Sequence, residues 1–254
     1  MKLTLIGNGF MAQALARGLV NNFEIEIIGR DANKLKKIQE QIPEIETKVM
    51  SDSENINNKN VIFCVKPYAL QSVAARLEGE SNILFSILAG TTLDTLKKQI
   101  KSKFYIRIMP NVAASVSKSM TTITGDKEAK NLAVELFNHL GKSVWVNTEA
   151  QLDIATAVAG SGPAFLSLVA ESLSDGAVKA GLERSISNEL VQGLFEGYSQ
   201  LLNTQHPALI KDSVMSPGGT TAAGMAKLEE CAVRSAMIKA VEAAHDKAIN
   251  IGKK

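Results

Sequence analysis

The pattern of the sequence changes once, near residue 150. Before that point, short runs rich in β-branched and aromatic residues alternate with helix-like runs, which is typical of βα units on a parallel sheet. After Asn147 the strand-like pattern stops, and the chain reads as helical to Lys254. We therefore expect an α/β protein with two domains, a parallel-sheet domain over residues 1–150 and an all-helical domain over residues 151–254. A chain of 254 residues is long enough to bury two cores.

The expected strands and helices follow from local patterns. VIFCV and ILFSIL show no polar alternation, so they should be central strands covered on both faces. Three further runs, LTLIG, EIEIIG and YIRIM, should complete the parallel sheet, while MTTIT and SVWVN should extend it or pack on its edge. In the second domain we expect helices over about 152–181, 187–203, 207–214, 220–229 and 232–252.

The first helix of the second domain is apolar around most of its circumference. Its charges are limited to Asp153, Glu171, Asp175 and Lys179, and the uncharged window 154–170, with 17 residues, is short for a membrane span and interrupted by GSGP. A helix that is apolar on every side must be enclosed. The other helices are few for this task, so we expect a partner subunit to contribute helices and the protein to be at least a homodimer.

Charge and cysteine content limit the kinds of partner. The chain has 28 Lys and Arg against 26 Asp and Glu, a formal charge of +2, which gives no reason to expect a nucleic-acid or membrane partner. Small molecules are the expected partners. Cys64 and Cys231 are expected to be reduced core thiols. The N-terminal segment lacks an apolar run of signal-peptide length, so we expect a cytoplasmic protein.

A glycine-rich turn, GNGFMA, follows the first strand-like run and opens a helix. Its G-x-G-x-x-A spacing allows a tight turn at Gly7, close approach of a pyrophosphate at Gly9 and helix packing at Ala12, with the phosphates at a helix N-terminus. This context predicts a dinucleotide site in a Rossmann-like domain, with a purely structural turn as the alternative. The cofactor-binding residues of this turn should be Gly7, Asn8, Gly9, Phe10 and Met11.

The end of the second strand favours NADP over NAD. Gly29 and Arg30 stand where NAD enzymes usually place an acidic residue on the ribose hydroxyls. A guanidinium can bind a 2′-phosphate through two hydrogen bonds, whereas a carboxylate would repel it. Two alternatives stay open: Asp31 reaches the ribose, or Arg30 is a solvated loop charge. We expect NADP(H) to be preferred and NAD(H) to be possible.

Two further strand ends should face the nicotinamide end of the cofactor, because ligands of doubly wound sheets bind beyond the carboxyl ends of the strands. Val65, Lys66 and Pro67 end the run VIFCV, and Asn111 follows the run ending in Met-Pro. The alternative for Lys66 is a charge that reaches from the strand end to solvent.

Glycine-rich segments also interrupt the helical half. GSGPAF at 160–165 either kinks or restarts a helix for packing, or lets the ring of a cofactor approach the backbone. SPGGTTAAG at 216–224 precedes a helix beginning near Thr220, so its free N–H groups and the helix dipole outline an anion cradle with neutral threonine hydroxyls beside it. The alternative is a helix–helix turn capped by Ser or Thr.

No set of side chains in the sequence predicts catalysis by itself. The three histidines form no constellation, and we find no metal-ligand spacing, Ser-His-Asp set or carboxylate pair, so no metal site is predicted. An enzyme with this sequence would depend on its cofactor for the difficult chemistry.

Taken in order, the motifs resemble those of the pyrroline-5-carboxylate reductases over nearly the whole chain. The matching segments are LIGNGFMAQALARGL, VIFCVKP, SILAG, RIMPN, LFNHLG, GSGPAF, SLSDGAVKAGL and HPALIKDSVMSPGGTT, followed by the alanine-rich last helix. The resemblance implies NAD(P)H-dependent hydride transfer to the imine carbon of 1-pyrroline-5-carboxylate, giving L-proline in the last step of proline biosynthesis. It also implies an N-terminal Rossmann-like domain and a helical C-terminal domain that dimerises by interleaving helices, with dimers associating further in some members.

The resemblance also implies a substrate site. Backbone amides around Gly219, Thr220 and Thr221 would hold the substrate carboxylate, and the Thr221 hydroxyl would orient the ring nitrogen, which makes Thr221 the catalytic candidate. GNGFMA and Arg30 would hold the pyrophosphate and the 2′-phosphate. The implied substrate-binding set is Ser216, Gly218, Gly219, Thr220 and Thr221.

Two positions depart from the usual pattern of that family. Val112 and Ala113 follow MPN where many members have Thr-Pro, and Gly29 stands where many have Ser or Asn. Two other functions are compatible with parts of the pattern. A related imine or β-hydroxyacid reductase would share the layout, but the β-hydroxyacid enzymes need a lysine where this chain has GSGPAF. A non-catalytic NADP-binding sensor is disfavoured by the intact carboxylate cradle.

Overall fold

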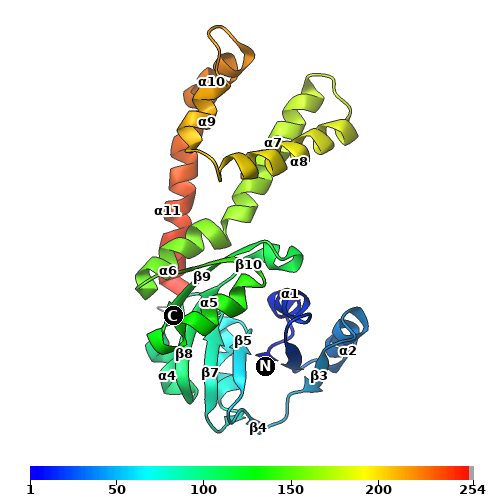
Figure 1. Ribbon diagram of the computed structural model, residues 1–254, viewed down its shortest axis with the longest axis vertical. Helices are drawn as coiled ribbons and strands as arrows, with labels where there is room; N and C mark the ends of the chain where they lie inside the picture. Colours follow the sequence, from blue (N-terminus) through cyan, green and yellow to red (C-terminus); the bar gives the residue numbers. More distant parts are fainter. Residues whose placement is uncertain (252–254) are drawn as a thin grey trace. The chain divides into compact units, whose positions relative to one another are not determined.

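The computed structural model describes residues 1–251, and they form two compact units (Figure 1). The first unit contains residues 1–161 together with the end of the chain from Ala243, and the second contains Gly162–Glu242.

A parallel sheet forms the centre of the first unit. Within the described residues its eight strands have the order β10-β9-β8-β7-β5-β1-β2-β3, and each neighbouring pair is parallel except β8 with β9. The expected parallel sheet is therefore confirmed, with VIFCV and ILFSIL at its centre as β5 and β7. The strand bounds are β1 (Lys2–Ile6), β2 (Glu24–Gly29), β3 (Glu46–Val49), β5 (Asn60–Phe63), β7 (Ser81–Ser86), β8 (Ser102–Met109), β9 (Ser119–Gly125) and β10 (Gly141–Trp145).

Apolar side chains cover both faces of this sheet. Neighbouring residues of a strand point to opposite faces, so Ile62 belongs to one buried cluster and Phe63 to the other. Helices α1, α2 and α5 add Leu15, Leu35 and Phe137 to the first cluster, while α3 and α4 contribute to the second. The helix bounds are α1 (Phe10–Leu19), α2 (Ala32–Gln41), α3 (Leu70–Ala74), α4 (Leu93–Gln99), α5 (Lys130–Asn138) and α6 (Glu149–Ala155).

Three short strands were not predicted. The edge strand β3 has the sequence ETKV, and β4 (Glu54–Asn55) and β6 (Leu77–Glu78) form a separate two-stranded sheet. These segments are short and mostly polar, so no apolar periodicity marks them. Their strand structure comes from backbone pairing with a neighbour, which local sequence does not specify.

The second unit is helical, as expected. It contains α7 (Gly162–Lys179), α8 (Arg184–Leu201), α9 (Pro207–Ser213) and α10 (Thr220–Glu230), and α11 (Val233–Ile251) continues into the end of the first unit. The largest departure from the predicted bounds is the first long helix. Instead of one helix over 152–181, the chain forms α6, a π-helical turn at Thr156–Gly160, and then α7 with Pro163 in its first turn.

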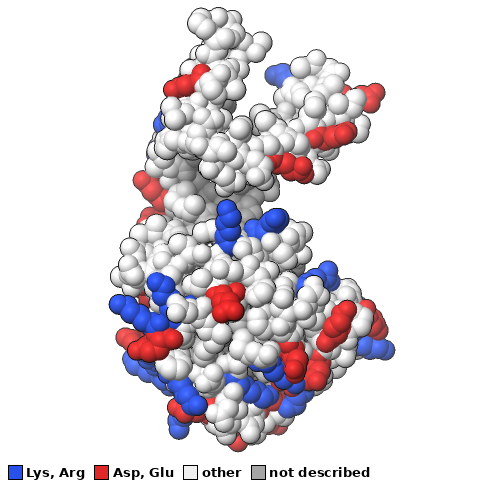
Figure 2. All heavy atoms as spheres, viewed as in Figure 1, with Lys and Arg blue, Asp and Glu red and all other residues white. Residues whose placement is uncertain are grey.

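The apolar helix of the second unit is not enclosed by its own chain. Leu166 and Leu168 of α7 are 52% and 65% exposed. Cys231 is exposed as well, so the expectation that it is a core thiol is wrong. Cys64 is buried, as expected. By length and composition alone, the segment Glu149–Lys179 could also span a membrane. On the face drawn in Figure 2, few charged side chains cover the helical unit. A single chain therefore leaves a large apolar surface uncovered.

Candidate functional site

The turn at Gly7 is fixed by the strands on either side of it. Gly7 has a φ of +120°, and a Cβ there would lie 2.6 Å from the carbonyl oxygen of Cys64. Its N–H donates to the carbonyl of Ile28 at 2.8 Å, at the end of β2. Only glycine combines this conformation with so close an approach to β5. The turn therefore lies where the ends of β1, β2 and β5 meet.

The N-terminus of α1 presents free backbone donors. The first intrahelical hydrogen bond runs from Gln13 N–H to Gly9 C=O at 3.2 Å, so the N–H groups of Phe10, Met11 and Ala12 have no acceptor among the described residues. No acidic residue occupies the first turn. A Cβ at Gly9 would meet nothing within 4 Å, so the space in front of these donors is open. Free donors, the positive end of the helix dipole and open space suit a pyrophosphate.

A cavity of about 170 Å³ opens at the carboxyl ends of these strands. The strand order changes direction at β1, with β2 and β3 on one side and β5 and β7 on the other, and ligands of doubly wound sheets bind at such a switch point. Six of the predicted cofactor residues line this one cavity: Gly7, Asn8, Gly9, Arg30, Val65 and Lys66.

The other predicted cofactor residues lie outside that cavity lining. Phe10 is 64% exposed at the start of α1, and Met11 packs against the core. Pro67 begins a short 3-10 helix (Pro67–Ala69) and lines a neighbouring cavity instead. Asn111 lies after β8, in a separate polar network.

The two residues at the β2–α2 connection have different surroundings. The Asp31 carboxylate caps α2, because its Oδ1 accepts from the backbone N–H of Lys34 at 3.0 Å. This bond weakens the alternative that Asp31 binds the ribose hydroxyls. Arg30 is exposed at the cavity, and no carboxylate lies within ion-pair distance of it among the described residues. A guanidinium without a protein anion favours an anionic ligand.

Cys64 also lines the cavity, below the turn at Gly7. Burial raises the pKa of its thiol well above the usual value. The thiol therefore stays neutral at physiological pH, and it adds no negative charge that would repel phosphates.

Asn111 joins three segments through its polar atoms. Its Nδ2 donates to the carbonyl of Ala159 at 3.0 Å, its Oδ1 accepts from Ala113 N–H at 3.0 Å, and its backbone N–H donates to Ser119 Oγ at 3.1 Å. Ala159 belongs to the π-helical turn Thr156–Gly160, which ends on the first residue of GSGP. The side chain is thus engaged in positioning this turn, and a contact with the nicotinamide stays a prediction.

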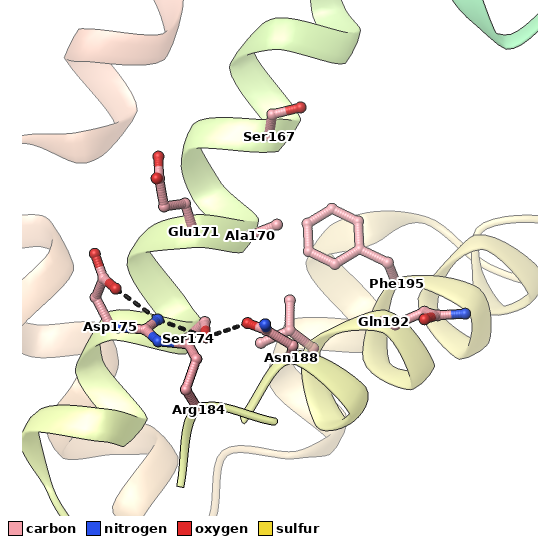
Figure 3. Close-up of a pocket in the computed structure, with 10 residues that line it drawn as sticks. Ser167, Ala170, Glu171, Ser174, Asp175, Arg184, Asn188, Gln192 and Phe195 are labelled. Atoms are coloured by element: carbon pink, nitrogen blue, oxygen red, sulfur yellow. Dashed lines mark hydrogen bonds and ion pairs between the residues drawn. The ribbon is translucent and has the colours of Figure 1, made fainter. Parts of the chain in front are cut away.

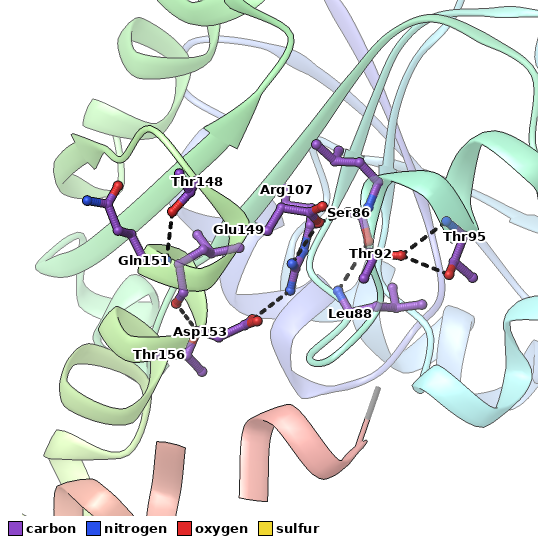
Figure 4. Close-up of polar contacts among 12 residues, drawn as sticks. Ser86, Leu88, Thr92, Thr95, Arg107, Thr148, Glu149, Gln151, Asp153 and Thr156 are labelled. Atoms are coloured by element: carbon purple, nitrogen blue, oxygen red, sulfur yellow. Dashed lines mark hydrogen bonds and ion pairs between the residues drawn. The ribbon is translucent and has the colours of Figure 1, made fainter. Parts of the chain in front are cut away.

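A buried arginine that sequence reasoning missed fixes the start of the same segment (Figure 4). Arg107, on β8, has a side chain only 1% exposed, and it pairs with Glu149 at 2.8 Å and Asp153 at 3.0 Å. Glu149 also accepts from the N–H of Leu93 at the start of α4 at 2.8 Å. The signal was present in the sequence: a lone charge inside the apolar run YIRIM must find buried partners, and two carboxylates four residues apart share one helix face.

Together, Arg107 and Asn111 hold residues 149–160 against the sheet. The π-helical turn is closed by the bond from Ser161 N–H to Thr156 C=O at 3.2 Å. Turns of this kind are frequent at functional sites. The helix therefore restarts at the GSGPAF segment, which agrees with the packing hypothesis. Close approach of a cofactor ring to this segment stays a prediction.

The SPGGTT loop in the second unit has the outline of an anion cradle. Gly218 has a φ of +70°, Gly219 N–H donates to Ser216 C=O at 3.0 Å, and Gly219 is the N-cap of α10 without a side-chain cap. The first helical hydrogen bond runs from Ala223 N–H to Gly219 C=O at 3.2 Å. The N–H groups of Thr220, Thr221 and Ala222 therefore have no acceptor within residues 1–251. The alternative of a turn capped by Ser or Thr finds no support in these contacts.

A larger groove of about 760 Å³ lies between α7 and α8 (Figure 3) and contains none of the predicted site residues. Arg184 pairs with Asp175 at 2.7 Å and donates to Ser174 Oγ at 2.9 Å, and Ser174 donates to Asn188 at 2.7 Å. These polar groups satisfy one another. Among residues 1–251, no group of three or more His, Cys, Asp or Glu side chains could hold a metal ion.

Comparison with known proteins covers the whole chain. Residues 149–251 match the family model for pyrroline-5-carboxylate reductase dimerisation, and residues 2–90 match the model described as NADP oxidoreductase coenzyme F420-dependent. The chain is 37% identical to a pyrroline-5-carboxylate reductase of Synechocystis, covering 100% of this chain and 99% of the relative. It is 35% identical to the Helicobacter pylori (strain J99) enzyme of the same name, covering 94% and 95%.

Solved structures give the same result. The 1-pyrroline-5-carboxylate reductase of Streptococcus pyogenes superposes with a TM-score of 0.87 at 30% identity, covering 98% of each chain. The Plasmodium falciparum pyrroline carboxylate reductase, solved with NADP bound, superposes with a TM-score of 0.81 at 26% identity, covering 99% of this chain and 98% of that one.

Proposed function

This chain belongs to the pyrroline-5-carboxylate reductase family, and we propose that the Gly7–Met11 turn of its first unit binds the cofactor and that the 216–221 loop of its second unit binds the substrate. As a member of the family, it is an oxidoreductase that reduces the C=N bond of 1-pyrroline-5-carboxylate with a nicotinamide cofactor and forms L-proline. The strongest support for this function is the 37% identity to the Synechocystis enzyme over nearly the full length of both chains.

The first unit fits the cofactor. Gly7 brings the turn against β5, the free N–H groups of Phe10, Met11 and Ala12 would hold the pyrophosphate, and Arg30 would hold the 2′-phosphate. The NADP oxidoreductase model that matches residues 2–90 and the NADP-bound relative support NADP. We propose that NADPH is preferred and that NADH is accepted more weakly. Val65, Lys66, Pro67 and Asn111 belong to the nicotinamide side in this assignment.

The second unit supplies the substrate cradle. The substrate carboxylate would accept hydrogen bonds from the free N–H groups of Thr220 and Thr221. Ser216, Gly218 and Gly219 would shape the loop, because the Gly219 N–H already donates to the Ser216 carbonyl. The Thr221 hydroxyl would orient the ring nitrogen. When bound, the cofactor supplies the hydride. The contribution of the chain is therefore to hold the substrate in one orientation, and correct orientation accounts for a large part of such catalysis.

The organisation of the chain follows from the same assignment. We propose a dinucleotide-binding domain over residues 1–150 and a substrate-binding and dimerisation domain over residues 151–254, forming a homodimer or a higher assembly of dimers. The match to the dimerisation model and the exposed apolar residues of α7 and α8 support it. Partner helices, rather than lipid, would then cover Glu149–Lys179. We place the protein in the cytoplasm, with no nucleic-acid or membrane partner.

The direct test is an assay of the purified full chain. NADPH and 1-pyrroline-5-carboxylate are mixed with the protein, the loss of NADPH absorbance is followed, and proline is identified by mass spectrometry. NADH is tested in parallel. A folded dimer that turns over neither cofactor would contradict the function. Binding of NADPH without turnover would instead favour the sensor hypothesis.

A further inference from the structure

Asn8 and Gly29 pack against each other at the cavity assigned to the cofactor. Asn8 is the second residue of the GNGFMA turn, and Gly29 is the last residue of β2. A Cβ at Gly29 would lie 2.7 Å from Cγ and 2.8 Å from Nδ2 of Asn8, closer than real Cβ contacts come. The Asn8 amide therefore occupies the space that a side chain at position 29 would need. A side chain at position 29 therefore fits only if the Asn8 side chain moves or is shortened.

The Asn8 amide keeps hydrogen-bonding capacity at the cavity. Its Nδ2 donates to the backbone carbonyl of Asp31 at 3.3 Å, which ties the turn to the β2–α2 connection. That is its one hydrogen bond to the described residues, so a second N–H and the carbonyl oxygen stay available. The neighbouring Asp31 carboxylate is engaged with Lys34 N–H. Asn8 and Arg30 are thus the available polar side chains on this side of the cavity, with Lys66 on the β5 side.

We propose that Asn8, packed against Gly29, is the residue that binds the adenosine ribose of the cofactor, and that Arg30 provides most of the discrimination between a 2′-phosphate and a 2′-hydroxyl. The proposal rests on the proposed cofactor site. An amide both donates and accepts, so its oxygen can accept from a 2′-hydroxyl and its N–H can donate to a 2′-phosphate. A guanidinium only donates and favours the anion. Asn8 therefore strengthens binding of both cofactor forms, and the Asn8–Gly29 pair replaces a polar side chain at the end of β2.

The test is a double-mutant cycle on ligand binding with the full-length protein. Isothermal titration calorimetry measures the affinities of adenosine 2′,5′-bisphosphate and 5′-AMP for the original chain, Asn8→Ala, Gly29→Ser and the double variant. Asn8→Ala should weaken both ligands, by about 2- to 12-fold for the neutral hydrogen bond to 5′-AMP and by a smaller factor than Arg30→Ala for the bisphosphate. Arg30→Ala should weaken only the bisphosphate, by about 10- to 150-fold for bonds to a charged group. Gly29→Ser should weaken both ligands by displacing the Asn8 amide.

The double variant decides whether the pair is coupled. Once Asn8 is truncated, a serine side chain at position 29 has room, so the double variant should bind no more weakly than Asn8→Ala alone, and the two losses should not add. If Gly29→Ser alone does not fold, its rescue by Asn8→Ala supports the same coupling, and failure of the double variant to fold overturns it. Additive losses, or unchanged affinities in Asn8→Ala, also overturn the proposal. Asn21→Ala, at an exposed position outside the cavity, is the matched control and should change neither affinity.

Because the two fragments contain neither nicotinamide nor substrate, the cycle is separate from the turnover assay. A chain that reduces 1-pyrroline-5-carboxylate but shows additive losses keeps its proposed function and loses this inference. A chain that binds neither fragment nor NADPH loses both.

Discussion

The two glycine-rich segments, one proposed to bind the cofactor and the other the substrate, obtain their geometry in different ways. In the Gly7–Met11 turn, the first glycine is set against β5 and the following helix N-terminus faces a cavity lined by three strand ends. In the 216–221 loop, a Cβ at Gly218 would meet nothing within 4 Å, and most of the loop is exposed in the single chain. The first segment is therefore held by the packing of its own unit, whereas the second is held by its local backbone conformation.

The strongest test of this contrast is Arg107→Met, which breaks the buried ion pairs of the first unit. Removing one partner leaves Glu149 and Asp153 without their cation, which typically costs about 3–5 kcal/mol. We expect a large fall in the free energy of unfolding, measured by urea denaturation followed by circular dichroism. Arg76→Met is the control, because Arg76 is 41% exposed and pairs with fully exposed Asp52 at 3.5 Å. Equal losses in the two variants would contradict the structural role of Arg107.

A smaller but still large loss is expected for Gly7→Ala. The added Cβ meets the Cys64 carbonyl in a backbone conformation that L-residues avoid, which together cost about 2–4 kcal/mol. Both the melting temperature and NADPH binding should fall. In Gly9→Ala the Cβ meets no protein atom but enters the space assigned to the pyrophosphate. That variant should keep its melting temperature and lose NADPH affinity; if it loses stability as well, the open space at Gly9 has another role.

These positions also show what the sequence could and could not predict. Gly7 and Gly9 follow from a spacing whose steric meaning is general, and Arg30 follows from its position at the end of the second strand, so the cavity they line was predictable. The lone charge of Arg107 in YIRIM signals buried partners, but only the fold shows that these partners are Glu149 and Asp153 of α6. The strand β3 was missed because pairing with β2, not residue preference, makes it a strand. The outline of the SPGGTT loop was predictable, but the identification of its ligand depends on similarity to a family.

A moderate effect on turnover is expected for Thr221→Ala. Loss of one neutral hydrogen bond to the ring nitrogen should lower kcat/KM for 1-pyrroline-5-carboxylate about 10-fold, while the Kd for NADPH stays unchanged. Steady-state kinetics and calorimetry measure the two quantities separately. Thr204→Ala, an exposed threonine in the turn after α8, serves as the control. A parallel loss of NADPH affinity in Thr221→Ala would indicate a folding defect instead of a substrate contact.

A much smaller loss of stability than in Gly7→Ala is expected for Gly218→Ala, and this difference separates the two regions most clearly. The left-handed φ of +70° makes alanine unfavourable by about 1 kcal/mol, but no neighbouring atom lies within 4 Å of the new Cβ. The melting temperature should therefore change little, in contrast to Gly7→Ala. Because the loop conformation directs the N–H groups at the start of α10, KM for the substrate should rise while NADPH affinity is kept. If Gly218→Ala unfolds the protein as readily as Gly7→Ala does, the loop is held by packing after all, and the contrast between the two segments is wrong.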